Sequence, residues 1–239
     1  MKQPIRFYRD FTDTDRWTAY RVKVDTTDLF IRSKVDLSSM AEAAVRRIRG
    51  DLWRHIEEIP DFLTSLSPLP VPEDCPGAAA AMYRAGTAAG VGPMAAVAGT
   101  IAGMVGIELA EHSPEVIVEN GGDIWLRAER PVEVSVYAGE FRFAGKLRVM
   151  IHPGSTPCGI CTSSATMGHS LSFGKADAVT VIAGDAALAD ALATACCNMI
   201  QACDDIPVAL EYAMDHGASG IIAILYDSMG IKGNIELAG

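Results

Sequence analysis

Alternating hydrophobic and polar residues mark the first predicted elements of the chain. Residues 17–24 (WTAYRVKV) and 28–34 (DLFIRSK) alternate as half-buried strands do, and Thr26-Thr27 lies between them, which predicts a β-hairpin. Over residues 38–56 the apolar positions instead recur with helical spacing, at Met40, Ala44, Ile48 and Leu52. Because this stretch begins with Ser38-Ser39, it predicts a capped amphipathic helix.

The rest of the chain mixes helical and strand patterns. A proline-rich connector at residues 67–76 precedes helical patterns over 78–89 and from Pro93. Further elements are predicted as strands at 115–119, 123–128, 132–137, 146–151 and 177–183, helices at 186–203 and near 207–216, and a closing hairpin of 220–226 and 231–237. Because strands and helices do not alternate strictly, we expect an α+β fold of layered sheets and helices. Residues 1–239 would form one domain, in which the segment 67–76 either connects two subdomains or crosses the surface.

One uncharged stretch has the length of a membrane span. Residues 85–107 carry no charged side chain over 23 residues. The stretch is mostly alanine and glycine and contains Pro93, so transfer into lipid would gain little free energy. It therefore predicts a buried helix rather than a membrane span.

Charge and cysteine content narrow the class of partner. The 239 residues include 30 acidic and 20 basic side chains, a net charge of −10, which argues against nucleic acid or an anionic membrane as the main partner. A local basic pocket for a phosphorylated ligand stays open. Residues 1–30 contain no apolar signal segment, so the six cysteines are expected to be reduced thiols of a cytoplasmic protein. Nothing in the sequence indicates an oligomeric state.

The alanine-rich predicted helix near the C-terminus carries two oxygen ligands. Asp190 and Thr194 are four residues apart and so share one face of the helix. A carboxylate on this small-residue face is costly unless something pairs with it. Mg²⁺ would fit, because it takes one or two protein oxygens and leaves its other positions to phosphates and water. We expect both side chains to face a cleft shared with residues 162–170.

Two further motifs lie between this helix and the middle of the chain. Asn120-Gly121-Gly122-Asp123 joins two apolar runs and predicts a hairpin turn, where consecutive glycines also let a ligand approach the backbone. Around His169, the hydroxyl side chains of a predicted loop are able to hydrogen-bond phosphate or ribose; they are Thr162, Ser163, Ser164, Thr166 and Ser170.

A single CxxC motif, Cys158 to Cys161, opens that predicted loop. A zinc ribbon needs a second pair with matching spacing, and a thioredoxin-like motif begins a helix. We therefore favour a structural role for both thiols. The alternative is a redox or metal site completed in the tertiary structure by Cys196, Cys197 and Cys203.

Several of these motifs, taken in order, resemble the ApbE-like flavin transferases. The run Ala178–Ala183 and the helix Ala189–Ala195 are similar to the family's SVTVIAP-like strand and ADALATAL-like helix. Gly121-Gly122-Asp123-Ile124 is similar to its N-A-G-G-D-I segment, and Thr162-Ser163-Ser164 falls at its T-S-G. His169 falls at the histidine of its S-H-I-I-D-P-R-T-G segment, and Gly217 to Leu237 is similar to its terminal hairpin.

The resemblance, which covers about residues 85–237, implies a fold, a cofactor and a reaction. The fold would be α+β with two intertwined subdomains. The protein would bind FAD or FMN and, with Mg²⁺, transfer FMN from FAD to a Thr or Ser of an acceptor protein. Asp190 and Thr194 would hold the metal, and His169 and Asp190 would be catalytic. The cofactor-binding residues would be Gly121, Gly122, Asp123, Thr162, Ser163, Ser164 and His169.

The chain also departs from the family's pattern. SLSFGKAD follows His169 where the family has I-I-D-P-R-T-G, and Glu119-Asn120 replaces its Asn-Ala. These features resemble a cytosolic branch of the superfamily, some members of which are associated with sulfide-dependent homocysteine formation. Two alternatives to flavin transfer therefore stay open: a non-catalytic flavin- or nucleotide-binding accessory protein, and a thiol-dependent protein of sulfur metabolism.

Overall fold

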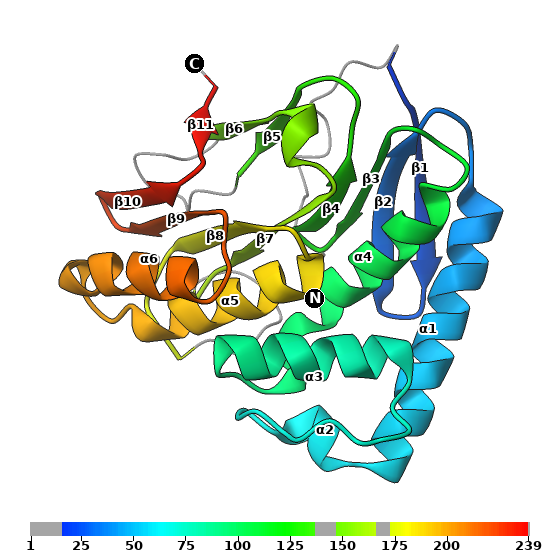
Figure 1. Ribbon diagram of the computed structural model, residues 1–239, viewed down its shortest axis with the longest axis horizontal. Coiled ribbons are helices and arrows are strands. Elements are labelled where there is room, and N and C mark those ends of the chain that lie inside the picture. The colour runs from blue at the N-terminus through cyan, green and yellow to red at the C-terminus, as the bar shows by residue number, and fades with distance from the viewer. Residues whose placement is uncertain (1–15, 137–146, 166–172, 239) are drawn as a thin grey trace.

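An eight-stranded antiparallel sheet forms the centre of the computed structural model, which describes residues 16–136, 147–165 and 173–238 (Figure 1). Its strands lie in the order β1-β2-β3-β4-β7-β8-β9-β10. They are β1 (Thr18–Val24), β2 (Thr27–Ser33), β3 (Val116–Asn120), β4 (Asp123–Arg127), β7 (Cys158–Ser163), β8 (Ala178–Ala183), β9 (Gly220–Leu225) and β10 (Ser228–Gly233). The α+β prediction is confirmed.

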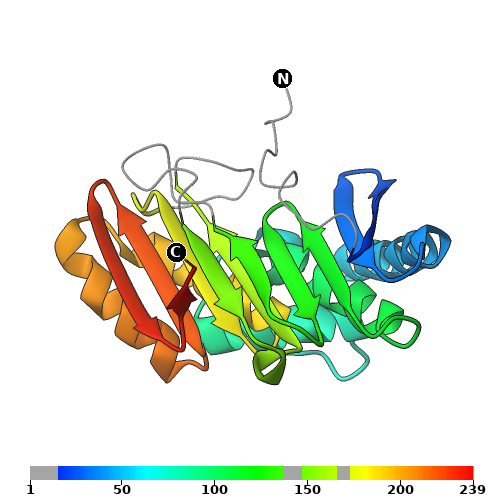
Figure 2. The ribbon, with the colours of Figure 1, turned by 90° about the horizontal axis from the view of Figure 1, so that it is seen from above.

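Helices cover one face of this sheet, and a three-stranded sheet covers part of the other (Figure 2). The helices are α1 (Ser38–Glu58), α2 (Asp61–Thr64), α3 (Gly77–Ala89), the 3₁₀ turn η2 (Pro93–Ala96), α4 (Val97–Leu109), α5 (Ala186–Met199) and α6 (Ile206–Asp215). The small sheet has the order β11 (Glu236–Leu237), β6 (Arg148–Ile151) and β5 (Val132–Ser135).

The central strands are apolar on both faces because both faces are covered. Successive side chains of a strand point to opposite faces. Trp125 and Cys161 therefore pack in the core under the helices, whereas Leu126 and Ile160 pack against the small sheet. Two hydrophobic cores result, one on each side of β4 and β7.

The uncharged stretch identified in the sequence is divided between two helices. Among the described residues, no single helix is long and apolar enough to cross a membrane; α3 and the η2–α4 segment pass that test only as a pair bent by 104°. The bend follows Gly90, whose φ of 67° is the left-handed conformation that glycine adopts without strain. Much of α4 is buried, with Gly106 against the ring of Trp125.

Two glycines in helices allow a matched stability test. A Cβ at Gly106 would lie 2.2 Å from Trp125 Cε3, so Gly106→Ala should lower the free energy of unfolding by about 2 kcal/mol or more. A Cβ at Gly50, on α1, meets nothing within 4 Å, so Gly50→Ala should raise it by about 0.5–1 kcal/mol through helix propensity. Urea unfolding of both variants checks these signs, and a stable Gly106→Ala protein would contradict the packing.

Some of the local predictions are confirmed by the structure and others are wrong. The first hairpin is confirmed, with Val24 paired to Thr27. So is the two-residue turn after Asn120, where Gly121 and Gly122 have φ values of 71° and 116°. The predicted serine cap of α1 is wrong, because Asp36 Oδ1 accepts the Ser38 N–H at 2.8 Å. The predicted start of a loop at 158–163 is also wrong, because these residues form the buried strand β7.

Candidate functional site

Asp190 lies against the N-terminus of α4. Its Oδ2 accepts a hydrogen bond of 2.8 Å from the backbone N–H of Gly99, in the first turn of that helix, and its exposed fraction is 9%. The N–H groups of a first helical turn lack partners within the helix and carry partial positive charge, so they suit a carboxylate. A side chain at Gly99 would not fit, because its Cβ would lie 2.2 Å from Ala186 O.

A second carboxylate, that of Asp123, lies near Asp190. Asp123 begins β4 directly after the Gly121-Gly122 turn, and its Oδ1 accepts the N–H of Thr162 at 3.3 Å. Burial raises the pKa of Asp123 to about 7, and burial together with the charge of Asp123 raises the pKa of Asp190. Two neighbouring carboxylates repel each other when both are ionised, and a divalent cation bound between them would offset this repulsion.

The turn that precedes Asp123 is tied to the same helix terminus. Asn120 donates its Nδ2 hydrogen to Ala98 O at 3.1 Å, and Gly122 N donates to Glu119 Oε1 at 2.8 Å. The chain's Glu119-Asn120 pair therefore fixes both the shape of the turn and its distance from α4. These contacts, and the role of Gly99, were missed by sequence reasoning, which interpreted residues 85–107 only as a buried helix.

Two hydroxyl side chains lie further along the same side of the sheet. Thr194 is one turn beyond Asp190 and has an exposed fraction of 9%. Ser163 is 8% exposed, and its Oγ has no hydrogen-bond partner among the described residues. A buried hydroxyl without a partner is uncommon and calls for an explanation, such as a ligand.

The packing of α5 on β7 places Ser163 at the level of Thr194. Gly159 lies directly under Ala186, at the start of α5. From there, four strand residues to Ser163 cover about 13 Å and eight helical residues to Thr194 cover about 12 Å. The two elements run in the same direction, since Cys161 lies near Asp190. Both hydroxyls therefore lie beyond the carboxylate pair in the direction of β7 and α5, Ser163 two strand residues past Cys161 and Thr194 one helical turn past Asp190.

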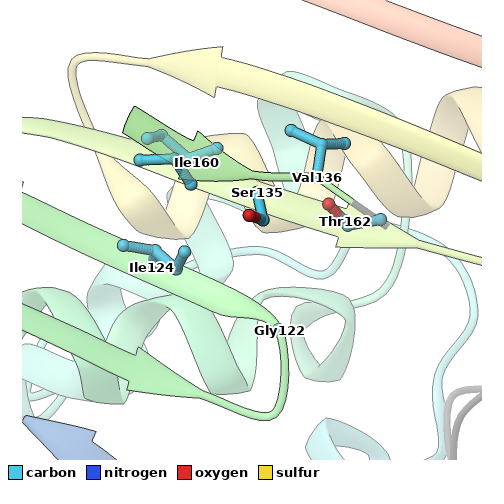
Figure 3. A pocket seen from close by; sticks show the side chains of 7 residues that line it. Gly122, Ile124, Ser135, Val136, Ile160 and Thr162 are labelled. Atoms are coloured by element: carbon cyan, nitrogen blue, oxygen red, sulfur yellow. The ribbon is translucent and has the colours of Figure 1, made fainter. Parts of the chain in front are cut away.

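Thr162 points to the opposite face of the sheet. Its Oγ1 lies 2.8 Å from Thr180 Oγ1, and it lines a small cavity between the two sheets (Figure 3). The other residues that line this cavity are Gly122, Ile124, Val134, Ser135, Val136 and Ile160. The expectation that Thr162 and Ser163 share one loop facing Asp190 is wrong, because neighbouring residues of a strand face opposite ways.

The two thiols of the CxxC motif are separated by the sheet itself. Cys158 is buried in the core beside the small sheet, and Cys161 is buried under the helices. Three strand residues span about 10 Å, whereas the Cβ atoms of a disulfide are about 3.8 Å apart. The pair therefore cannot form a disulfide or bind one metal ion, and the structural interpretation of the motif is favoured.

The reactivity of the cysteines should follow their burial. Burial raises the pKa of Cys158 to about 12, and burial with the charges of Asp123 and Asp190 raises that of Cys161. We expect iodoacetamide at neutral pH to label the partly exposed Cys75 and Cys203 first, and to leave Cys158 and Cys161 unmodified in the folded protein. Mass spectrometry across pH checks this order. Rapid labelling of Cys161 would contradict it.

The remaining predicted site residues are placed only in part. Ser164 is partly exposed just beyond the end of β7, and Gly121 is exposed in its turn. His169 and the part of the predicted cleft at 166–170 lie outside the described residues. Within the described residues, no three His, Cys, Asp or Glu side chains are close enough to hold a metal by themselves.

A family profile and several relatives match most of the chain. A family profile described as AbpE bacteria matches residues 9–216. A UPF0280 protein of Methanocaldococcus jannaschii is 42% identical over 228 residues, which cover 92% of each chain. Another UPF0280 protein, from Methanopyrus kandleri, is 43% identical over 224 residues and 89% of each chain.

Two solved structures share the architecture at low sequence identity. The flavinyl transferase ApbE of Pseudomonas stutzeri, in its apo form, superposes with a TM-score of 0.58 at 12% identity, over 90% of this chain and 94% of that one. The ApbE protein of Thermotoga maritima gives 0.57 at 14% identity, over 91% and 96%. At these identities the likeness is one of fold.

Proposed function

Because the chain belongs to the AbpE bacteria family and has the fold of the ApbE flavin transferases, we propose that it binds FAD together with Mg²⁺ and transfers FMN to a protein acceptor. The observation that carries the proposal is the carboxylate pair of the partly buried Asp123 and the buried Asp190, on the helix face that also carries Thr194. This arrangement joins three of the residues that the resemblance assigns to the metal and the cofactor.

The donor chemistry at this place fits a hard divalent cation. Asp190 and Thr194 offer oxygens from one face of α5. The carboxylates of Asp190 and Asp123 repel each other when both are ionised, and a cation between them would remove that repulsion. Mg²⁺ is commonly held by one or two carboxylates and completes its shell with water and substrate phosphates. The bound cation would neutralise charge on the pyrophosphate of FAD.

The chain's own groups would orient the nucleotide. Glycines at 121 and 122 let the backbone of the turn approach a ligand without side-chain interference. The hydroxyl of Ser163, which has no partner in the described part of the chain, supports a role as a donor to phosphate or ribose oxygen.

The reaction would exchange the phosphoanhydride bond of FAD for a phosphoester bond to the acceptor. The acceptor hydroxyl forms an O–P bond to the FMN phosphorus, the pyrophosphate bond breaks, and AMP leaves with the electron pair. The hydroxyl proton must pass to a base. His169 is the proposed catalytic residue for this proton, and Asp190 acts by holding the metal.

Flavin retention and AMP release together test the proposal. Purified protein incubated with FAD and Mg²⁺ should retain flavin through desalting, and EDTA should abolish the retention. With an acceptor present, AMP should appear in the ratio of one per flavin bound covalently. Ser163→Ala should weaken retention, whereas the exposed Ser155→Ala serves as the matched control. No Mg²⁺-dependent retention by the wild type would overturn the proposal.

A non-catalytic flavin-binding protein is the second candidate. The segment SLSFGKAD after His169, in place of the family's I-I-D-P-R-T-G, favours it. This candidate predicts retention of intact FAD with no AMP release for any acceptor, so the same experiment separates the two.

A further inference from the structure

The thiol of Cys161 lies beside both buried carboxylates. Cys161 is fully buried, and it is placed opposite Asp123 by the register that pairs Ile124 with Ile160. Its Sγ is 3.4 Å from the carbonyl oxygen of Ala186, at the start of the helix that carries Asp190. The thiol therefore lies where β4, β7 and α5 meet.

The thiol acts here as a hydrogen-bond donor. A thiol with the ordinary cysteine pKa of about 8.5 keeps its proton at neutral pH, and Cys161 is fully buried. The single S–H hydrogen has two candidate acceptors: the Ala186 carbonyl oxygen, 3.4 Å from Sγ, and the carboxylate of Asp123, the residue that faces Cys161 across the β4–β7 pair. A charged acceptor takes the stronger hydrogen bond of the two.

Cys158 shows what a merely packed thiol looks like on the same strand. It is 2% exposed, and its surroundings are the apolar core beside the small sheet. Burial is the cause of its raised pKa. The two cysteines thus lie on one strand and match in burial, and they differ in whether a carboxylate is in reach.

We propose that Cys161 is a positioning residue, whose S–H donates to the Asp123 carboxylate and holds it toward Asp190 so that both carboxylates present oxygens to one divalent cation. This rests on the proposed function for the cation, and on the register of β4 with β7 for the contact with Asp123. The N–H of Thr162 binds Oδ1 of Asp123, and the thiol of Cys161, on the same strand as Thr162, would fix the rotation of the carboxylate. Without the thiol, the carboxylate is free to rotate away from the site.

Cation affinity in a set of cysteine variants tests the positioning role. Mg²⁺ binding, measured by calorimetry on the full chain, should weaken about tenfold in Cys161→Ala, the loss expected for one hydrogen bond to a charged group. Cys161→Ser, which restores a donor, should recover most of the affinity. Cys158→Ala, an equally buried truncation, should change it less than about twofold. Equal effects of Cys161→Ala and Cys161→Ser, or no effect of either, would overturn the proposal.

An infrared measurement without cation or flavin tests the contact independently. The S–H stretching band of Cys161, identified by its loss in Cys161→Ser, should shift when Asp123→Asn weakens the acceptor. The band of Cys158, identified in the same way, should stay in place. An unmoved Cys161 band would mean that the thiol donates to Ala186 O alone, and the proposal would fail. If the wild type shows no Mg²⁺ affinity, the proposed function fails, while the infrared result still decides whether Cys161 orients Asp123.

Discussion

Asp190→Asn is expected to raise the free energy of unfolding of the cation-free protein by about 1–2 kcal/mol, or its melting temperature by about 4 °C. The amide oxygen still accepts the Gly99 N–H, so the contact with α4 survives. The change removes a carboxyl group whose ionisation is opposed first by burial and then by the charge of Asp123. At the same time the variant should lose the stabilisation that Mg²⁺ gives the wild type. Thermal melts with and without Mg²⁺ measure both effects.

The pH dependence of this gain has a definite sign. The folded-state pKa values of Asp123 and Asp190 are raised, so wild-type stability falls as pH rises above about 4, the pKa of an unfolded aspartate. The advantage of Asp190→Asn is therefore present at neutral pH and disappears below about pH 4. Asp190→Ala, which also removes the acceptor for Gly99, should lose part of the gain. A less stable Asp190→Asn protein would contradict the repulsion between the two carboxylates.

Glu115→Gln is expected to lower the free energy of unfolding by about 3 kcal/mol. Glu115 is 1% exposed; Arg16 Nε donates to its Oε2 at 3.1 Å, Lys34 Nζ lies 2.6 Å from the same oxygen, and Glu129 N donates to Oε1 at 3.0 Å. Neutralising the carboxylate leaves the largely buried guanidinium of Arg16 without its counter-charge. Urea unfolding at neutral pH measures the loss.

Acid should remove the same stabilisation in the wild type. Burial alone raises the pKa of Glu115, but the hydrogen bonds from Arg16, Lys34 and Glu129 N together hold it at about 2. Because the folded pKa is below the unfolded value of about 4.3, the contribution is full above pH 4.3 and is lost as pH falls toward 2. Glu133→Gln, in an exposed pair with Arg148, is the control and should change stability by less than about 0.5 kcal/mol. Equal losses in both variants would contradict the assignment.

Short-range patterns in the sequence identified most of the elements and two parts of the site. The alternating runs on either side of Thr26 identified the first hairpin. Asn120-Gly121-Gly122-Asp123 identified the turn between β3 and β4, because a turn that requires positive φ selects glycine locally. Helical spacing likewise placed Asp190 and Thr194 on one face of α5. These features depend on residues within one turn or one hairpin, and so are contained in the sequence around them.

Strand β7 was missed for a physical reason. Its residues are almost all buried, because sheets or helices cover both faces, so the alternation that reveals a half-exposed strand is absent. The glycine of the CxxC motif and the hydroxyl residues that follow it were therefore interpreted as part of a loop. Recognising the strand changes the chemistry, since it places Thr162 and Ser163 on opposite faces and separates Cys158 from Cys161.

Tertiary structure alone decided which groups meet. The Gly99 N–H that binds Asp190 is 91 residues away in the chain, and Asp123 and Cys161 approach through the pairing of β4 with β7. Local sequence propensity does not encode these distances, because they depend on how the helices pack on the sheet in the hydrophobic core. The sequence by itself determined an α+β chain with an acidic, hydroxyl-bearing helix and a glycine turn. The packing of α4, α5 and the sheet made these into a buried pair of carboxylates with a thiol beside them.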